Sequence, residues 1–148
     1  MNITNDNEFK AALAGLSVAQ QRKVATTFVE NVLPLCSDTR VATVITIAKR
    51  DDVTDLELDA AYQLANTVRV ESFCNCGQEI DWQIQTTHFI ARAAMDCAKP
   101  ATEQTNLAWD AATDVRIART CHGITSGEPN EQQREAENQY RILAEFIN

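Results

Sequence analysis

Glycine and proline are scarce in this chain of 148 residues, which contains only four glycines and three prolines. These two residues mark most of the turns in β-rich folds, so a fold of many short strands and hairpins is disfavoured. Runs in which β-branched and polar residues alternate are also rare. Apolar residues instead recur at intervals of three and four, which is the spacing of one face of an α-helix. The sequence therefore predicts an all-α protein.

Signature motifs of common enzyme classes are missing. The sequence has no Gly-x-x-x-x-Gly-Lys-[Ser/Thr] phosphate loop, no Gly-x-Gly-x-x-Gly fingerprint, no Gly-x-Ser-x-Gly elbow and no His-Glu-x-x-His zinc helix. Only two histidines are present. These absences disfavour a nucleotide-dependent enzyme or a hydrolase, and we expect no catalytic residues.

Long apolar runs and a secretory leader are also absent. No run approaches the roughly 18 apolar residues that a membrane span requires. Residues 1–6 contain no basic region followed by an apolar one. The cysteine count is five, an odd number, whereas secreted disulfide frameworks pair their cysteines. We expect a cytoplasmic protein with reduced cysteines and no membrane partner.

Basic residues are outnumbered, with 13 lysines and arginines against 21 aspartates and glutamates, so the formal net charge is −8. A negative field repels phosphate backbones, and we therefore expect no nucleic-acid partner. The same field attracts a basic protein over long distances. Acidity of this kind also serves solubility alone, so a basic protein partner is permitted but not required.

Capping patterns predict several helix starts. Ser17–Gln20 and Thr54–Glu57 have the spacing of capping boxes, in which each side chain bonds to the backbone N–H of the other residue. Asp38 and Asn130 each precede an apolar pattern and are expected to be N-caps.

Helix ends are predicted at the few prolines and glycines. Pro34 and Pro100 disfavour helix directly before them, and Gly123 is expected to end a helix. The expected helices cover residues 8–16, 17–33, 38–48, 54–73, 79–99, 106–122 and 130–147.

Short loops between these segments predict one domain over residues 1–148, a bundle of six to seven helices. A short α-helical repeat array is the alternative, because Tyr62, Phe89 and Trp109 begin similar helical patterns. Their spacings are 27 and 20 residues, however, whereas repeat proteins hold a steadier period. The bundle is therefore preferred.

Two segments are expected to form the centre of the bundle. Residues 79–99 are apolar on almost every side, which is typical of a helix surrounded by others. Residues 106–122 place small side chains on one face: Ala108, Ala111, Ala112, Val115 and Ala118. Small side chains let two helix axes approach closely.

Six of the seven cysteines and histidines lie between residues 74 and 122, and only Cys36 lies outside this segment. Zinc needs four such ligands in a tetrahedron. The candidate ligands are Cys74, Cys76, Cys97 and Cys121, with His122 or His88 as substitutes. Buried cysteines commonly only pack, and we prefer this interpretation, so that no cofactor is expected. Zinc binding remains an alternative, as does a redox pair of Cys74 and Cys76.

A polar strip interrupts the apolar surface of the segment 79–99. His88, Arg92 and Asp96 follow one another at intervals of four, and Arg92 is expected to reach Asp96 in one turn. Together with Arg116 they are candidates for a polar pocket in which His88 acts as an acid or base. A structural network, or a helix edge facing water, would produce the same pattern.

Trp82 and Trp109 are the largest side chains and are candidates for either core or interface anchors. The leading hypothesis is a non-enzymatic protein that binds another protein; an immunity-type protein against a basic toxin is a narrower version that the charge permits. A metal- or thiol-based sensor built on residues 74–122 is the alternative. A small-molecule pocket or enzyme around His88 and Arg92 is the second alternative.

Overall fold

The computed structural model describes residues 2–74, 80–100 and 106–148, except for the side chain of Cys74. Helix makes up 79% of these residues, and no strand occurs among them, so the all-α prediction is confirmed. None of the helices in these ranges is long and apolar enough to cross a membrane. The elements are α1 (Asp6–Ala14), α2 (Val18–Glu30), the short 3-10 helix η1 (Leu33–Leu35), α3 (Arg40–Ala48), α4 (Asp55–Cys74), α5 (Trp82–Ala98), α6 (Leu107–Ser126) and α7 (Glu131–Ile147).

Two capping boxes start helices where the sequence predicts them. The Ser17 hydroxyl accepts a hydrogen bond from the Gln20 backbone N–H at 3.2 Å, and the Gln20 side chain accepts one from the Ser17 N–H at 3.0 Å. Thr54 and Glu57 exchange the same pair of bonds before α4, both at 3.1 Å. Each box satisfies backbone donors that the first turn of a helix leaves free, and it thereby fixes where α2 and α4 begin.

The boundaries of the first two helices differ from the predicted ones. α1 starts at Asp6 rather than at residue 8, because the Asn5 side chain accepts the backbone N–H of Glu8 at 2.9 Å and caps the helix there. α2 ends at Glu30 rather than near residue 33. Pro34 then lies within η1, where its fixed φ and missing N–H suit the first turn of a 3-10 helix.

The starts of α3 and α5 are also shifted. Asp38 was expected to be the N-cap of α3, but Thr39 occupies that position, and the Asp38 carboxylate accepts the backbone N–H of Arg40 at 3.0 Å from one residue further back. α5 starts at Trp82 rather than at residue 79, because the Asp81 side chain accepts two backbone N–H bonds of the first turn, at 3.0 and 3.2 Å.

The turn between α6 and α7 corrects two further predictions. α6 continues through Gly123 to Ser126, and it is Gly127, with a φ of 75°, that ends it in the left-handed conformation glycine adopts without strain. Gly123 has a different role, because a Cβ atom there would lie 3.0 Å from the backbone oxygen of Glu128. Asn130 precedes α7 with a φ of 63°, but its side chain makes no capping hydrogen bond.

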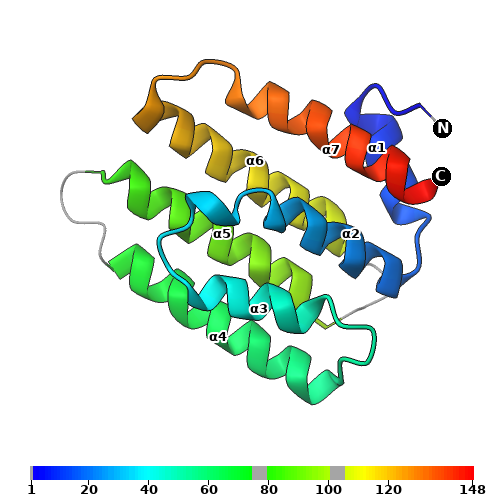
Figure 1. Cartoon of the computed structure of the whole chain (residues 1–148), viewed down its shortest axis with the longest axis horizontal. Coiled ribbons are helices and arrows are strands. Elements are labelled where there is room, and N and C mark those ends of the chain that lie inside the picture. Colours follow the sequence, from blue (N-terminus) through cyan, green and yellow to red (C-terminus); the bar gives the residue numbers. More distant parts are fainter. Residues whose placement is uncertain (1, 75–79, 101–105) are drawn as a thin grey trace.

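The helices form two layers (Figure 1). Helices α4, α5, α6 and α7 form a row in which each packs against the next. On one side of this row, α3 lies against α4 and α5, and α2 lies against α5 and α6, whereas α1 packs against α6 and α7 at the end of the bundle that holds both termini. Because α2 packs against helices that follow it much later in the chain, the fold is a bundle rather than an array of repeats that contact only their neighbours.

The core lies between the two layers and along the α5–α6 contact, which is the most extensive in the bundle. As predicted, α5 is central and packs against α2, α3, α4 and α6. Small side chains are buried where α5 and α6 meet the rest of the core: Ala91, Ala93, Ala94 and Ala98 of α5, and Ala108, Ala111, Ala112 and Ala118 of α6. The larger buried side chains include Phe9, Leu13 and Phe28 from the covering helices.

Four of the exposed large apolar side chains share a similar place in the fold. They lie at or next to helix ends, where fewer neighbouring helices are available to bury a side chain than in the middle of a helix. Their exposed fractions are 39% for Val18, 81% for Leu56, 62% for Ile80 and 36% for Ile147.

Replacing Ala111 by leucine should destabilise the bundle. Ala111 is fully buried on α6, so the extra atoms would overpack a close helix contact, and we expect the free energy of unfolding to fall by roughly 1–3 kcal/mol in urea titrations. Ala60→Leu is the control, because Ala60 is exposed on α4, and it should change stability by less than about 0.5 kcal/mol. Equal stabilities of the two variants would contradict the packing described above.

Candidate functional site

The polar strip of α5 faces the side of the row that α1, α2 and α3 do not cover. We call this side of α4, α5 and α6 the open face, because no further helix lies over it in the described ranges. We assign side chains to the open face from the periodicity of the three helices and from the lining of the hollow described next. They are Tyr62, Arg69 and Phe73 of α4; Phe89, Arg92, Asp96 and Lys99 of α5; and Asp110, Asp114 and Ile117 of α6.

A hollow of about 470 Å³ opens in the open face. We call it the α4–α6 hollow, because all three helices contribute to its wall. Its lining side chains are Tyr62, Arg69, Arg92, Met95, Asp96, Lys99 and Asp114. Helices that pack closely against one another hold these side chains in place, and the volume lies in the range of small-molecule sites.

Two ion pairs cross between α5 and α6 at the hollow. Lys99 Nζ lies 2.5 Å from Asp110 Oδ2, and Arg92 Nε lies 3.6 Å from Asp114 Oδ1. The sequence predicted instead that Arg92 would pair with Asp96 one turn away on α5, and this prediction is wrong. A pairing across two helices depends on their packing, which intrahelical spacing does not reveal.

Asp96 is the unusual carboxyl group of the hollow. Its burial and its hydrogen bond to the neighbouring Asp114 carboxylate raise its pKa to about 9. Its Oδ2 atom is buried, and no described residue donates a hydrogen bond to it. Lys99 Nζ lies 3.4 Å from Asp96 Oδ1, but Asp110 is closer and supplies the charged partner. Asp96 therefore keeps its proton at neutral pH.

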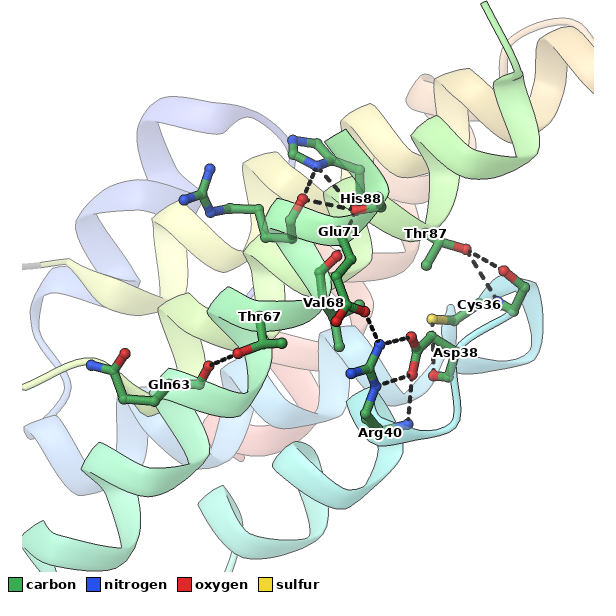
Figure 2. Close-up of polar contacts among 12 residues, drawn as sticks. Cys36, Asp38, Arg40, Gln63, Thr67, Val68, Glu71, Thr87 and His88 are labelled. Carbon is green, nitrogen blue, oxygen red and sulfur yellow. Dashed lines mark hydrogen bonds and ion pairs between the residues drawn. The ribbon is translucent and has the colours of Figure 1, made fainter. Parts of the chain in front are cut away.

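His88 lies one turn before Arg92 and is held against α4 (Figure 2). Its Nδ1 atom is 3.0 Å from the Arg69 carbonyl oxygen and 3.3 Å from the Ser72 hydroxyl. A carbonyl only accepts, so Nδ1 carries the proton, and the lone pair is on Nε2. Burial lowers the pKa of His88 below its usual value, so the ring is neutral at pH 7. His88 lies beside the α4–α6 hollow, not in its lining, and joins α5 to α4.

Polar contacts on other sides of α4 and α5 fasten α3 and the segment before it to the row (Figure 2). Arg40 donates to the Asp38 carboxylate at 2.7 Å and to the Glu71 carboxylate at 2.5 Å. The hydroxyl groups of Ser37 and Thr87 lie 2.9 Å apart and link the segment before α3 to α5. These contacts lie away from the α4–α6 hollow, and we assign them a structural role.

Arg116 belongs to a different cluster from His88, Arg92 and Asp96, contrary to the prediction. Its guanidinium donates to Asp6 of α1 at 3.0 Å and to Gln139 of α7 at 2.8 Å. Three aromatic rings surround its Cζ atom, with centroids 5.4, 5.6 and 5.8 Å away: Phe9, Trp109 and Tyr140. Arg116 lies on the side of α6 that faces α7. Its side chain therefore connects α6 with α1 and α7.

A second cavity, of about 710 Å³, is a groove beside Arg116 at the turn between α6 and α7. Its main polar groups already bind one another: Arg116 donates to Asp6, and the Tyr140 hydroxyl donates to the same carboxylate at 2.6 Å. This pairing satisfies the charges and leaves a structural role for the cluster.

Cys97 and Cys121 lie at opposite ends of the α5–α6 pair. The contacts of Arg92 with Asp114 and of Lys99 with Asp110 show that the two helices run antiparallel. Cys97 is therefore level with about residue 110, some 11 residues and about 16 Å from Cys121 along the helix. Zinc holds sulfur at about 2.3 Å, so the predicted site containing both cysteines is wrong.

The remaining candidate ligands give no metal site either, as far as the structure extends. Cys76 and the side chain of Cys74 lie outside the described residues. His122 follows Cys121 on α6 and is half-buried. Within the ranges that are described, no group of three or more Cys, His, Asp or Glu side chains is placed to hold a metal ion.

The described cysteines are free thiols: Cys36 is half-buried, and Cys97 and Cys121 are buried. Burial raises the pKa of all three thiols above the usual value. The thiolate is the nucleophile and the metal ligand, so a raised pKa lowers the reactivity of these side chains.

The tryptophans are only partly buried. Trp109 packs beside Phe9, with ring centroids 6.1 Å apart, and the Lys10 ammonium lies 5.3 Å above its ring. Trp82 is the first residue of α5. The aromatic side chain with a largely exposed surface is instead Phe73, at 67%.

Sequence reasoning missed Tyr62, Arg69, Phe73 and Lys99 as site residues. The signal for the first three was present, because 62, 66, 69 and 73 lie on one face of a helix at intervals of four, three and four. That face combines aromatic and arginine side chains. A search of α4 for a second, less buried helix face would have identified these side chains.

Replacing Asp96 by asparagine should stabilise the protein at neutral pH. The native pKa of about 9 exceeds the value of about 4 in an unfolded chain, so the native state binds more protons between these values and loses stability as pH rises through them. Asparagine cannot ionise and removes this loss. We expect Asp96→Asn to be more stable than wild type by several kcal/mol at pH 7.5, because each pH unit between the two pKa values costs the wild type about 1.4 kcal/mol, and of similar stability near pH 4.

Urea unfolding across this pH range measures the effect. Asp59→Asn is the control for removing one negative charge, because Asp59 is exposed on α4. A less stable Asp96→Asn variant at pH 7.5 would show that the ionised form of Asp96 is the native one.

Comparisons with known proteins add no family or function to this geometry. No protein-family model, no curated protein and no solved structure matches the chain. The argument for function therefore depends on the open face and the α4–α6 hollow.

Proposed function

We propose that the protein acts by binding another protein through its open face. The observation that supports this proposal is the asymmetry of the row: α2 and α3 bury one of its sides, whereas the opposite side of α4, α5 and α6 keeps exposed aromatic, aliphatic and arginine side chains around a hollow. Aromatic and arginine side chains contribute most of the binding energy at many protein interfaces.

The side chains of the open face suit this role. Phe73 and Ile117 are 67% and 39% exposed, so a partner would bury apolar surface that water now contacts. The Arg92 guanidinium lies 5.3 Å from the centroid of the half-buried Phe89 ring, which holds a cation in place beside the hollow. The resulting interface would have apolar side chains around a charged hollow.

We further propose that the protein is non-enzymatic. The described thiols are protonated, and the Nδ1 atom of His88 binds a backbone carbonyl of α4. The charged side chains of the hollow are partly paired with one another, as in the Lys99–Asp110 contact. Such an arrangement is suited to binding a partner rather than to catalysis.

A basic partner in the cytoplasm is the finer version of this proposal. The net charge of −8 attracts basic proteins. Free thiols at Cys36, Cys97 and Cys121 favour a reducing compartment. An immunity-type protein that neutralises a basic toxin fits this version.

Charge substitution on the open face should abolish partner binding. We expect Phe73→Asp to reduce by at least tenfold the amount of a specific protein that the wild-type chain captures from source-cell extract, because a carboxylate replaces an exposed aromatic anchor. Quantitative mass spectrometry of the captured proteins measures this ratio. Photo-crosslinking from position 73 should then join the same protein covalently.

Leu56→Asp is the matched control. Leu56 is 81% exposed on the same helix but lies about 25 Å from Phe73 along the axis, so this variant should keep the partner. Loss of the partner in both variants, or in neither, would contradict binding through the open face. Self-association of the wild-type chain that Phe73→Asp abolishes would replace the heterologous partner by a second copy, and would overturn this version of the proposal.

A further inference from the structure

The α4–α6 hollow carries positive charge in an otherwise acidic protein. Its lining contains the cations Arg69, Arg92 and Lys99. When Asp96 keeps its proton, these three cations face two carboxylates, Asp114 in the lining and Asp110 against Lys99, which leaves a net charge of +1. The whole chain has a charge of −8. An anion that approaches this surface is therefore attracted to the hollow and repelled elsewhere.

The two guanidinium groups of the hollow are poorly neutralised. Arg69 donates from Nε and Nη2 to the Asn66 side-chain oxygen, at 3.0 and 2.9 Å, and this partner is a neutral amide on the same helix. Arg92 reaches Asp114 only at 3.6 Å, and its side chain remains 47% exposed. Each guanidinium therefore keeps donors for a ligand, in the planar arrangement that binds a carboxylate through two hydrogen bonds.

Two uncharged polar side chains complete the lining of the α4–α6 hollow. Tyr62 contributes a phenol to the lining. No described residue donates a hydrogen bond to the buried Oδ2 atom of Asp96. Its single proton is donated to Asp114, so Asp96 adds no negative charge to the lining.

We propose that the α4–α6 hollow is a binding site for a carboxylate group, held by Arg69 and Arg92. A volume of about 470 Å³ admits a small organic acid or the end of an acidic side chain. The second source depends on the proposed function, because the side chain would come from the protein partner. A partner can be basic overall and still present one carboxylate at this point.

NMR titration of the intact chain with succinate tests the site directly. At constant ionic strength set with chloride, succinate should shift the backbone amide signals of residues in the lining, such as Tyr62, Met95 and Lys99, with saturation. Succinamide has the same carbon skeleton without charge and should shift them at least tenfold less. Arg69→Gln and Arg92→Gln should each weaken succinate binding at least fivefold, because each removes one guanidinium.

Arg134→Gln is the matched control, because Arg134 is 63% exposed on α7, outside the hollow, and this variant should bind succinate as wild type does. Far-ultraviolet circular dichroism checks that each variant is folded. Equal shifts with succinamide or with chloride alone would overturn the proposal, as would unchanged binding in both Arg69→Gln and Arg92→Gln.

A short capped peptide with one glutamate separates the two sources of the carboxylate. If succinate and this peptide both bind with the same dependence on Arg92, and the glutamine version does not bind, the site accepts an acidic side chain. If succinate alone binds, the ligand is a free organic acid. If neither binds at millimolar concentration, the inference is wrong. These probes contain no partner protein, so failure here leaves the Phe73 experiment unaffected.

Discussion

The packing of α5 is the constraint on which the rest of the structure depends. This helix contacts α2, α3, α4 and α6, and small side chains let α6 approach it closely. A helix surrounded in this way has only one side left for polar residues. The strip with His88, Arg92 and Asp96 occupies that side, so the packing that forms the core also determines where the polar residues gather.

The same constraint explains the protonation of Asp96. Neighbouring helices bury its carboxyl group and bring Asp114 of α6 next to it, and two carboxyl groups in a poorly solvated place do not both ionise at neutral pH. The result is a hollow in which arginine and lysine charges exceed the carboxylate charge. Residues with strongly perturbed pKa values occur often at functional sites, and the combination of this perturbation with an uncovered face favours recognition there.

The sequence predicts those features that depend on residues close together in the chain. The capping boxes at Ser17 and Thr54, the helical periodicity and the central position of α5 all follow from spacings of three or four residues, and the structure confirms them. A pattern of this kind also revealed the polar strip of α5. The pattern did not reveal which groups the strip would contact, because the ion-pair partner of Arg92 is Asp114 on α6.

Features that depend on long-range packing could not be predicted from the sequence. Arg116 binds Asp6, which is 110 positions earlier, and only the docking of α1 brings the two together. Cys97 and Cys121 belong to the segment that is rich in cysteine and histidine, but antiparallel packing of α5 and α6 separates them along the helix axis. Gly123 resembled a helix end in sequence, whereas its small size is needed at the approach of the turn before α7.

The positive hollow on the open face is the centre of this account, and its charge depends on the proton of Asp96. Carbon-13 NMR of the Asp96 carboxyl carbon, followed from pH 4 to pH 10 in the intact protein, measures that proton directly. The account predicts a carboxyl group that stays protonated through pH 7 and titrates near pH 9. A midpoint near pH 4, the value of an exposed aspartate, would contradict it.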